Sequence, residues 1–407
     1  MKKVLLTGIS GYIAMHCAKE LLKRDYHINA TVRNLDKVED IKNALSALSL
    51  DVNKIKFFQA DLLSDDNWED AMADCEYAMH VASPYPLNQP KDENVLIKPA
   101  VEGTERVVSL AIKNNVKKIV LTSSVVAVSV GHTKKEYSEE DWSFADKPIA
   151  AYAKSKTLAE KKAWELIKNA NTDTKLTVIN PSGVIGPSLT SEISSTQLII
   201  AGLMNGRIPV NLPIHIGYVD VRDVAKAHIL AMTNSASDGE RFIVSEKEMW
   251  LSESAQVLIN AGYNAPSRVM PNWFLKIMAM FNGDMVTISK MAGKSRDCHS
   301  TKAKDVLGWN PIPAEDSILR DSRYFDTVLL AILTPSFLSI SFILLSLKGC
   351  SLFSDIIIFF IFSITDVDDK LLPSSLFIAA EKKNFNSKTP KGVSIYFPFV
   401  NLDTVDS

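Results

Sequence analysis

Cysteine and histidine are scarce in this sequence, and neither is spaced as metal ligands are. The chain has 4 cysteines and 7 histidines, which form no ligand cluster. We therefore expect no zinc site, and we expect buried, reduced cysteines of the kind found in cytosolic proteins. We also expect His80 to be a core residue at the end of a strand. The cysteines are Cys17, Cys75, Cys298 and Cys350, and the histidines are His16, His27, His80, His132, His215, His228 and His299.

A strong charge, an export signal and a hydrolase motif are absent as well. The 407 residues carry a net charge of -2, with no basic stretch that would indicate a nucleic-acid partner. Met1–Lys3 is not followed by a long apolar segment before the first glycine, so no signal peptide is predicted. A Gly-x-Ser-x-Gly motif does not occur, which argues against an α/β-hydrolase. We expect a cytoplasmic protein with no nucleic-acid partner.

Short apolar runs alternate with helical patterns over residues 1 to 180. This alternation predicts an α/β fold, a doubly wound parallel sheet flanked by helices. Residues 180 to 325 are less regular and richer in proline, which indicates a smaller substrate-binding lobe rather than a separate domain. The predicted strands are Val4–Thr7, Ile28–Val32, Ile55–Ala60, Tyr77–Val81, Ile119–Thr122 and Leu176–Ile179, and the predicted helices are Tyr12–Lys23, Asp65–Ala73, Val101–Asn114, Ala150–Asn169 and Val221–Met232.

The composition changes after residue 325. Residues 328–365 are rich in Ile, Leu, Phe and Ser and contain only two charged side chains, Lys348 and Asp355. Val328–Leu347 is long enough to cross a bilayer as a helix, although Pro335 weakens that interpretation. We predict a catalytic domain over residues 1–325. Two interpretations of residues 326–407 stay open: a tail that associates with a membrane if 328–365 inserts, or an extension unrelated to the fold.

The segment Thr7–Ala14 is the first of two motifs that indicate chemistry. It follows the apolar run Val4–Leu6 and opens an amphipathic helix, so a strand turns through glycines into a helix. In that arrangement Gly8 makes the tight turn and Gly11 lets the backbone approach the pyrophosphate of a dinucleotide. The helix N-terminus then offers N–H groups to the phosphates. The position of the glycines, rather than their number, makes this motif specific.

The end of the second predicted strand bears on the choice between NAD and NADP. An acid there binds a free ribose hydroxyl, whereas an arginine pairs with a 2′-phosphate. Here the strand ends at Arg33, Lys37 follows, and the acids Asp36 and Asp40 lie beyond Arg33. This order favours NADP(H), with NAD as the alternative. After the third and fourth strands, the positions expected to contact the cofactor are Asp61, Leu62, Ala82 and Ser83.

The second motif is a tyrosine and a lysine on one face of a predicted helix. Tyr152 and Lys156 are one turn apart and within mutual reach. A tyrosine hydroxyl has an ordinary pKa of about 10, and a nearby ammonium favours the phenolate and brings that pKa toward the working range. Ser123 and Ser124 end the fifth strand, where open α/β sheets bind ligands. One of these serines is expected to hydrogen-bond the substrate oxygen, and the set predicts redox chemistry on a carbonyl or alcohol.

The order of these motifs resembles the extended short-chain dehydrogenase/reductase superfamily over residues 1–325. The resemblance is to its branch of dihydroflavonol reductases, cinnamoyl-CoA reductases and methylglyoxal or ketone reductases. The segments that carry it are Thr7–Ala14, Ala30–Arg33, His80–Pro84, Val101–Thr104, Leu121–Ser124, Tyr152–Lys156, Asn180–Pro187 and Tyr218–Ala225.

The resemblance implies an NADP-dependent carbonyl reductase with a Ser/Tyr/Lys triad. It assigns the catalytic serine to Ser124, beside Tyr152 and Lys156, and a second 2′-phosphate contact to Lys37. Plant dihydroflavonol reductases carry a substrate-binding asparagine where this chain has Ser129, so flavonoid reduction is not expected. The implied cofactor contacts are Gly8, Ser10, Gly11, Tyr12, Ile13, Arg33, Lys37, Asp61, Leu62, Ala82, Ser83, Tyr152, Lys156, Pro181 and Val184.

We therefore predict reduction of an aldehyde or ketone, as a small-molecule carbonyl substrate, by NADPH in a monomer or homodimer. Three alternatives stay open: a nucleotide-sugar epimerase or dehydratase, a steroid dehydrogenase-like enzyme on the same fold, and a non-catalytic NADP-sensing protein. The last is disfavoured by the presence of both Tyr152 and Lys156.

Overall fold

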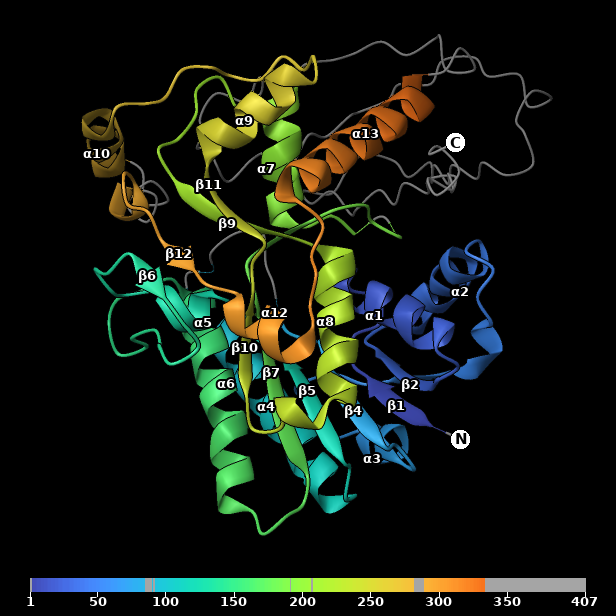
Figure 1. Cartoon of the computed structure of the whole chain (residues 1–407). Coiled ribbons are helices and arrows are strands. Elements are labelled where there is room, and N and C mark those ends of the chain that lie inside the picture. Colours follow the sequence, from blue (N-terminus) through green and yellow to red (C-terminus); the bar gives the residue numbers. More distant parts are fainter. Residues whose placement is uncertain are drawn as a thin grey trace, which may run out of the picture. The chain divides into compact units, whose positions relative to one another are not determined.

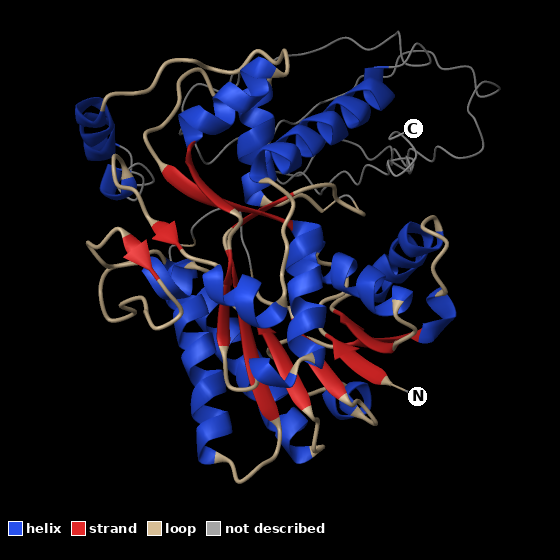
Figure 2. Cartoon of the chain, in the orientation of Figure 1, coloured by secondary structure: helices blue, strands red, loops and turns tan. Residues whose placement is uncertain are grey.

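Seven parallel strands form the central sheet of the computed structural model, which describes residues 2–84, 90, 92–190, 192–205, 208–281 and 289–333 (Figures 1 and 2). The strand order is β10-β7-β5-β4-β1-β2-β3, so the chain winds outward from β1 in both directions. The predicted doubly wound α/β sheet is confirmed. The strands are β1 (Lys3–Leu6), β2 (His27–Val32), β3 (Ile55–Gln59), β4 (Tyr77–His80), β5 (Lys118–Thr122), β7 (Lys175–Pro181) and β10 (Arg241–Val244).

Helices cover both faces of this sheet because each face is apolar. On one face α1 and α8 pack side by side, and on the other α4 packs along α6 (Figure 1). All five residues of β5 are buried, as expected for a strand that is covered on both sides. The helices of these layers are α1 (Tyr12–Lys23), α2 (Val38–Ser46), α3 (Trp68–Met72), α4 (Asn94–Lys113), α5 (Val126–Ser129), α6 (Ala151–Asn169), α8 (Val221–Thr233) and α12 (Thr301–Leu307), with short 3₁₀ turns at η1 (Leu35–Lys37), η2 (Val52–Lys54) and η3 (Ser235–Ser237).

The smaller lobe is built on a second sheet with strand order β11-β9-β8. Two further strands, β6 and β12, pair in parallel with each other. The lobe comprises β6 (Glu136–Tyr137), β8 (Gly183–Ile185), β9 (His215–Asp220), β11 (Lys247–Trp250), β12 (Asp297–Cys298), α7 (Ser195–Met204), α9 (Leu251–Asn260) and α10 (Asn272–Phe281), and the described chain ends with α13 (Ala314–Leu333).

Three elements differ from the sequence prediction, each for a local reason. The helix predicted from Val101 begins at Asn94 and continues through Pro99, which removes one N–H bond without ending the helix. The helix predicted from Asp65 begins only at Trp68, because Asn67 adopts a left-handed conformation with φ +64°. Arg241–Val244 falls within the range 180–325 predicted to form most of the lobe, yet it belongs to the central sheet as its edge strand beside β7.

Residues Met1–Arg323 form one compact unit, and a second unit begins at Tyr324 within α13. The hydrophobic tail predicted from residue 326 lies outside the described residues from position 334 onward. Within the described chain, no helix combines the length and the apolar character needed to cross a membrane.

Candidate active site

Gly8 makes the turn that leads from β1 into α1. Its backbone has φ +67°, a conformation that costs an L-residue about 1–2 kcal/mol. A Cβ at this position would also lie 2.9 Å from the Cβ of Ala82, which follows β4. Gly11 is the N-cap of α1 and gives the first helical turn no side-chain hydrogen bond. The turn therefore brings bare backbone, and the positive end of a helix, to the edge of the sheet, as an anionic phosphate requires.

The Thr7 hydroxyl holds the end of β4 against this turn. Its Oγ1 accepts hydrogen bonds from the backbone N–H groups of Val81 (3.0 Å) and Ala82 (2.9 Å). Because both lone pairs are used, the hydroxyl proton points to Nδ1 of His80 at 2.9 Å. Burial lowers the pKa of His80 to about 3, so the imidazole is neutral. His80 is thus a core residue, as predicted, while the clamp by Thr7 was not foreseen.

Substituting Gly8 by alanine is expected to destabilise the protein by more than the backbone penalty alone. The same substitution at Gly239, which has φ +77° and nothing within 4 Å of a new Cβ, is the matched control. Gly239→Ala should cost about 1 kcal/mol, whereas Gly8→Ala adds the contact with Ala82. Urea unfolding followed by tryptophan fluorescence measures both variants. Equal losses would contradict the crowding at Gly8.

A cavity of about 1690 Å³ follows the carboxyl ends of the strands on both sides of β1. Pockets for a single small ligand usually span about 300–1,000 Å³, so this one has room for a dinucleotide and a second molecule. It lies where the strand order reverses, the place at which open α/β sheets bind ligands. The predicted site residues that line it are Gly8, Ser10, Gly11, Tyr12, Ile13, Arg33, Asp61, Leu62, Ala82, Ser83, Ser124, Tyr152, Lys156, Pro181 and Val184.

Among the described cofactor candidates, Lys37 alone does not line the cavity. It stands in the 3₁₀ turn η1, and its ammonium lies 3.3 Å from a carboxylate oxygen of Glu192. Arg33 follows β2, is exposed and lines the cavity. The Tyr12 phenol donates a 2.6 Å hydrogen bond to the carbonyl of Gly186, so this side chain ties α1 to the lobe.

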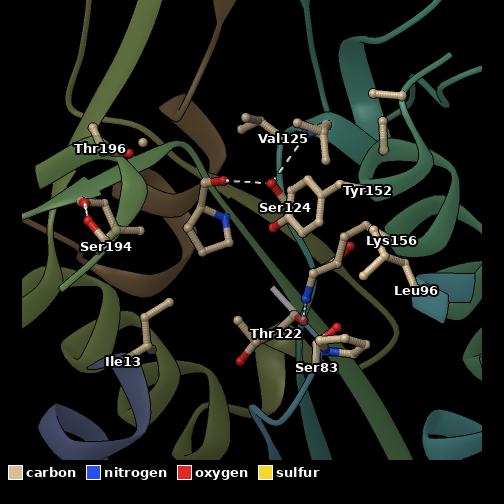
Figure 3. A pocket seen from close by; sticks show the side chains of 18 of the residues that line it. Ile13, Ser83, Leu96, Thr122, Ser124, Val125, Tyr152, Lys156, Ser194 and Thr196 are labelled. Atoms are coloured by element: carbon tan, nitrogen blue, oxygen red, sulfur yellow. Dashed lines mark hydrogen bonds between the residues drawn. The ribbon is translucent and has the colours of Figure 1, made fainter. Parts of the chain in front are cut away.

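The three predicted catalytic side chains meet at one part of the cavity. Figure 3 shows the Tyr152 ring beside Ser124, with Lys156 extended toward Thr122. Ser124 Oγ makes two long hydrogen bonds, donating to the carbonyl of Pro181 (3.4 Å) and accepting from the N–H of Val126 (3.3 Å). Such long bonds leave the hydroxyl ready to exchange them for a ligand oxygen.

Lys156 is buried, and its ammonium donates to the Thr122 carbonyl at 3.3 Å. Burial lowers the pKa of Lys156 to about 8, and the charge of Glu160 opposes that shift. The side chain is therefore charged at neutral pH but loses its proton under mildly alkaline conditions. A cation with this pKa is suited to favouring the phenolate of the adjacent Tyr152.

Glu160, which sequence reasoning missed, holds the elements around Lys156 together through its carboxylate. Its Oε2 accepts from Ser123 Oγ (2.5 Å) and Asn180 Nδ2 (2.9 Å), and its Oε1 accepts from Arg241 Nε (2.5 Å). The carboxylate is fully buried and joins α6, β7, β10 and the residue that follows β5. The sequence does carry a signal, since Glu160 follows Lys156 by one helical turn on the same face of α6.

No group of three or more metal-ligating side chains occurs among the described residues. Cys17, Cys75 and Cys298 are free and buried, and burial raises the pKa of the Cys75 and Cys298 thiols to about 12. Thiolate chemistry is therefore not supported at these cysteines.

Comparison with known proteins identifies the family of this chain. It matches the NAD dependent epimerase/dehydratase family over residues 4–245. It is 35% identical over 265 residues to a cinnamoyl-CoA reductase of Medicago truncatula, covering 63% of this chain and 79% of the relative. An anthocyanidin reductase of Vitis vinifera is 32% identical over 275 residues, covering 63% and 80%.

Among solved structures, Gre2 of Candida albicans in complex with NADPH is similar with a TM-score of 0.66 and 25% identity, covering 80% of this chain and 99% of that one. The resemblance predicted from the ordered motifs is confirmed. The chain belongs to the NAD-dependent epimerase/dehydratase family, in the branch that contains cinnamoyl-CoA reductases, anthocyanidin reductases and methylglyoxal reductases.

Proposed function

We propose that this protein reduces a small aldehyde or ketone to an alcohol, with NADPH as the hydride donor and Tyr152 as the proton donor. The family of this chain and its reductase relatives support the statement that it is an NADP-dependent oxidoreductase. The observation that carries the proposed reaction is the meeting of Ser124, Tyr152 and Lys156 in the cavity that begins at the glycine turn. We also place the catalytic domain at residues 1–325, because the compact unit Met1–Arg323 contains every site residue named above.

The residues of the cavity fit a dinucleotide. Gly8 lines the cavity without a side chain, because a Cβ there would meet Ala82, and the N-terminus of α1 has no side-chain cap to compete with a phosphate. Arg33 lines the cavity and would bind the 2′-phosphate through charge-assisted hydrogen bonds. The bound cofactor would supply the hydride.

The protein's own groups would handle the substrate oxygen and its proton. Ser124 Oγ would give up its long bond to the Pro181 carbonyl and donate to the substrate oxygen. Tyr152 would transfer its hydroxyl proton to that oxygen as negative charge develops there. Lys156 would stabilise the phenolate that remains, which its buried position beside the same cavity allows.

The proposal is tested with the full chain by following the consumption of NADPH, through its near-ultraviolet absorbance, with small aldehydes, diketones and aromatic ketones. Turnover with several carbonyl compounds is expected. Binding of NADPH without turnover of any of them would contradict the reductase and favour an NADP-sensing role. Tightly held NAD after purification would favour an epimerase instead.

Arg33→Ser is expected to raise KM for NADPH by about 10- to 100-fold and to leave KM for NADH nearly unchanged. The reason is that a hydrogen bond to a charged group contributes about 1.5–3 kcal/mol, and only NADPH carries the 2′-phosphate. Lys37→Ser is the matched control, since Lys37 pairs with Glu192 and does not line the cavity. Steady-state kinetics with both cofactors measure the effect. An equal rise for NADH would mean that Arg33 acts on the fold rather than on the phosphate.

A further inference from the structure

Glu248 places a carboxyl group on the lobe side of the same cavity. It stands on β11 directly opposite Gly217 of β9. One carboxylate oxygen, Oε1, is fixed by two donors, Ser245 Oγ at 2.9 Å and the N–H of Cys298 at 3.3 Å. The other oxygen, Oε2, makes no hydrogen bond with any described residue, and it is not sealed from the cavity. The protein thus fixes Oε1, whereas Oε2 is left accessible to a ligand in the cavity.

Gly217 makes room for this carboxyl group. A Cβ there would lie 2.5 Å from Oε2 and 2.6 Å from Oε1 of Glu248. The backbone of Gly217 does not adopt a positive φ, so its conformation does not demand glycine. Any larger residue would push the carboxyl group out of its place. The pairing of Gly217 with Glu248 is therefore explained by space for the acid rather than by the turn or the strand.

The acid has no cationic partner among the described residues. Burial, helped by the nearby charge of Asp297, raises the pKa of Glu248 to about 7 against the opposing effect of the hydrogen bonds from Ser245 and Cys298. Buried carboxylates that serve the fold alone are generally paired or fully hydrogen-bonded. An acid that is half satisfied and borders a cavity is instead typical of a group that meets a ligand.

Resting on the proposed reductase function, we propose that Glu248 recognises the substrate by accepting a hydrogen bond from a hydroxyl group remote from the reacting carbonyl. In the carboxylate form, which prevails above a pH of about 7, Oε2 can only accept, so it calls for a hydrogen-bond donor. An ammonium group would also donate, but the charged side chains that line the cavity besides Glu248 are six basic ones, among them Lys290, Lys294 and Arg296, and three acidic ones, which disfavours a cationic ligand. A neutral aldehyde or ketone that carries a hydroxyl group can donate this hydrogen bond and has no positive charge.

The test compares two aldehydes that differ in one proton: 4-(hydroxymethyl)benzaldehyde, which donates, and 4-(methoxymethyl)benzaldehyde, which only accepts. The ratio of their kcat/KM values is measured for the wild type and for Glu248→Gln. In this variant the amide oxygen keeps the bond from the Cys298 N–H, and the amide nitrogen then faces the cavity as a donor. We expect the wild type to prefer the hydroxymethyl compound by about tenfold and the variant to lose or reverse that preference.

Two further variants are measured in the same way: one displaces the acid without removing it, and the other is a control on the surface. Gly217→Ala retains the acid but displaces it, and should lose the preference as well, which covers the case in which Glu248→Gln does not fold. Glu165→Gln, on the exposed face of α6, should behave as the wild type. An unchanged ratio in both Glu248→Gln and Gly217→Ala would overturn the assignment of Glu248 while leaving the reductase intact.

Binding gives a readout that does not require turnover. The corresponding benzamides are not reduced, so their dissociation constants from the NADPH-loaded protein can be measured by calorimetry. The hydroxymethyl amide should bind about tenfold more tightly than the methoxymethyl amide in the wild type and not in Glu248→Gln. If no aldehyde is reduced yet this difference is found, the proposed function fails and the recognition by Glu248 stands. Equal affinities in both proteins would overturn the recognition.

Discussion

Tyr152→Phe is expected to lower kcat for carbonyl reduction by about two to four orders of magnitude, the range usually supplied by a positioned general acid. The phenylalanine ring keeps the shape of the side chain beside Ser124 and removes only the hydroxyl that would deliver the proton. The affinity for NADPH should change little, because the glycine turn and Arg33 are untouched. Single-turnover kinetics together with fluorescence titration of NADPH separate the two effects.

A matched variant controls for the loss of a tyrosine hydroxyl in general. Tyr77 begins β4 at the end of the sheet away from the cavity, and it is not among the residues that line it. Tyr77→Phe should therefore retain full turnover. Full turnover in Tyr152→Phe would contradict the proposed role of Tyr152 and leave Ser124 or a solvent molecule as the source of the proton.

The parts of this protein that could be predicted from sequence are those with a short-range signal. Gly8 and Gly11 follow an apolar run and open a helix, and the spacing of Tyr152 and Lys156 places them on one face. Such features depend on backbone conformation and helical period, which a few neighbouring residues determine. The strand β10, in contrast, was missed because Arg241–Val244 is short and its burial depends on pairing with β7, far away in sequence.

The lobe side of the cavity was beyond sequence reasoning for the same reason. Glu248, Gly217 and Cys298 come from three strands, β11, β9 and β12, and no local pattern connects them. Their arrangement arises only when β11 pairs with β9 and the N–H of Cys298 approaches the carboxylate. The proposed substrate recognition by Glu248 thus depends on long-range contacts, whereas the proposed cofactor site depends on a local turn.

Glu160→Gln is expected to lower the free energy of unfolding by about 3–5 kcal/mol, the usual cost of breaking a buried ion pair on one side. The substitution leaves the guanidinium of Arg241 buried without its counter-ion. That group is fixed by other contacts, since it donates to the carbonyl of Glu139 at 2.6 Å and its guanidinium lies 3.8 Å from the ring centre of Trp142. It therefore cannot turn toward solvent to recover its hydration. Urea unfolding measures the loss.

The exposed pair formed by Glu69 and Lys113 is the control. Both side chains are more than half exposed, so Glu69→Gln should cost less than about 1 kcal/mol. A double-mutant cycle then isolates the buried pair: Glu160→Gln combined with Arg241→Met should cost less than the sum of the single variants, because no uncompensated charge remains. Strict additivity would show that the two charges do not stabilise each other.

Glu160→Gln should also change the pH dependence of catalysis, which a purely structural role would not do. The charge of Glu160 raises the pKa of Lys156 against the effect of burial, which together give a value of about 8. Because the ammonium form is the one that stabilises the Tyr152 phenolate, kcat/KM for reduction should fall as the pH rises through about 8 in the wild type. Without the carboxylate the pKa of Lys156 is lower, so the fall should begin at a lower pH in the variant. If the variant is less stable but keeps the wild-type pH profile, Glu160 supports the fold around Lys156 without tuning its charge.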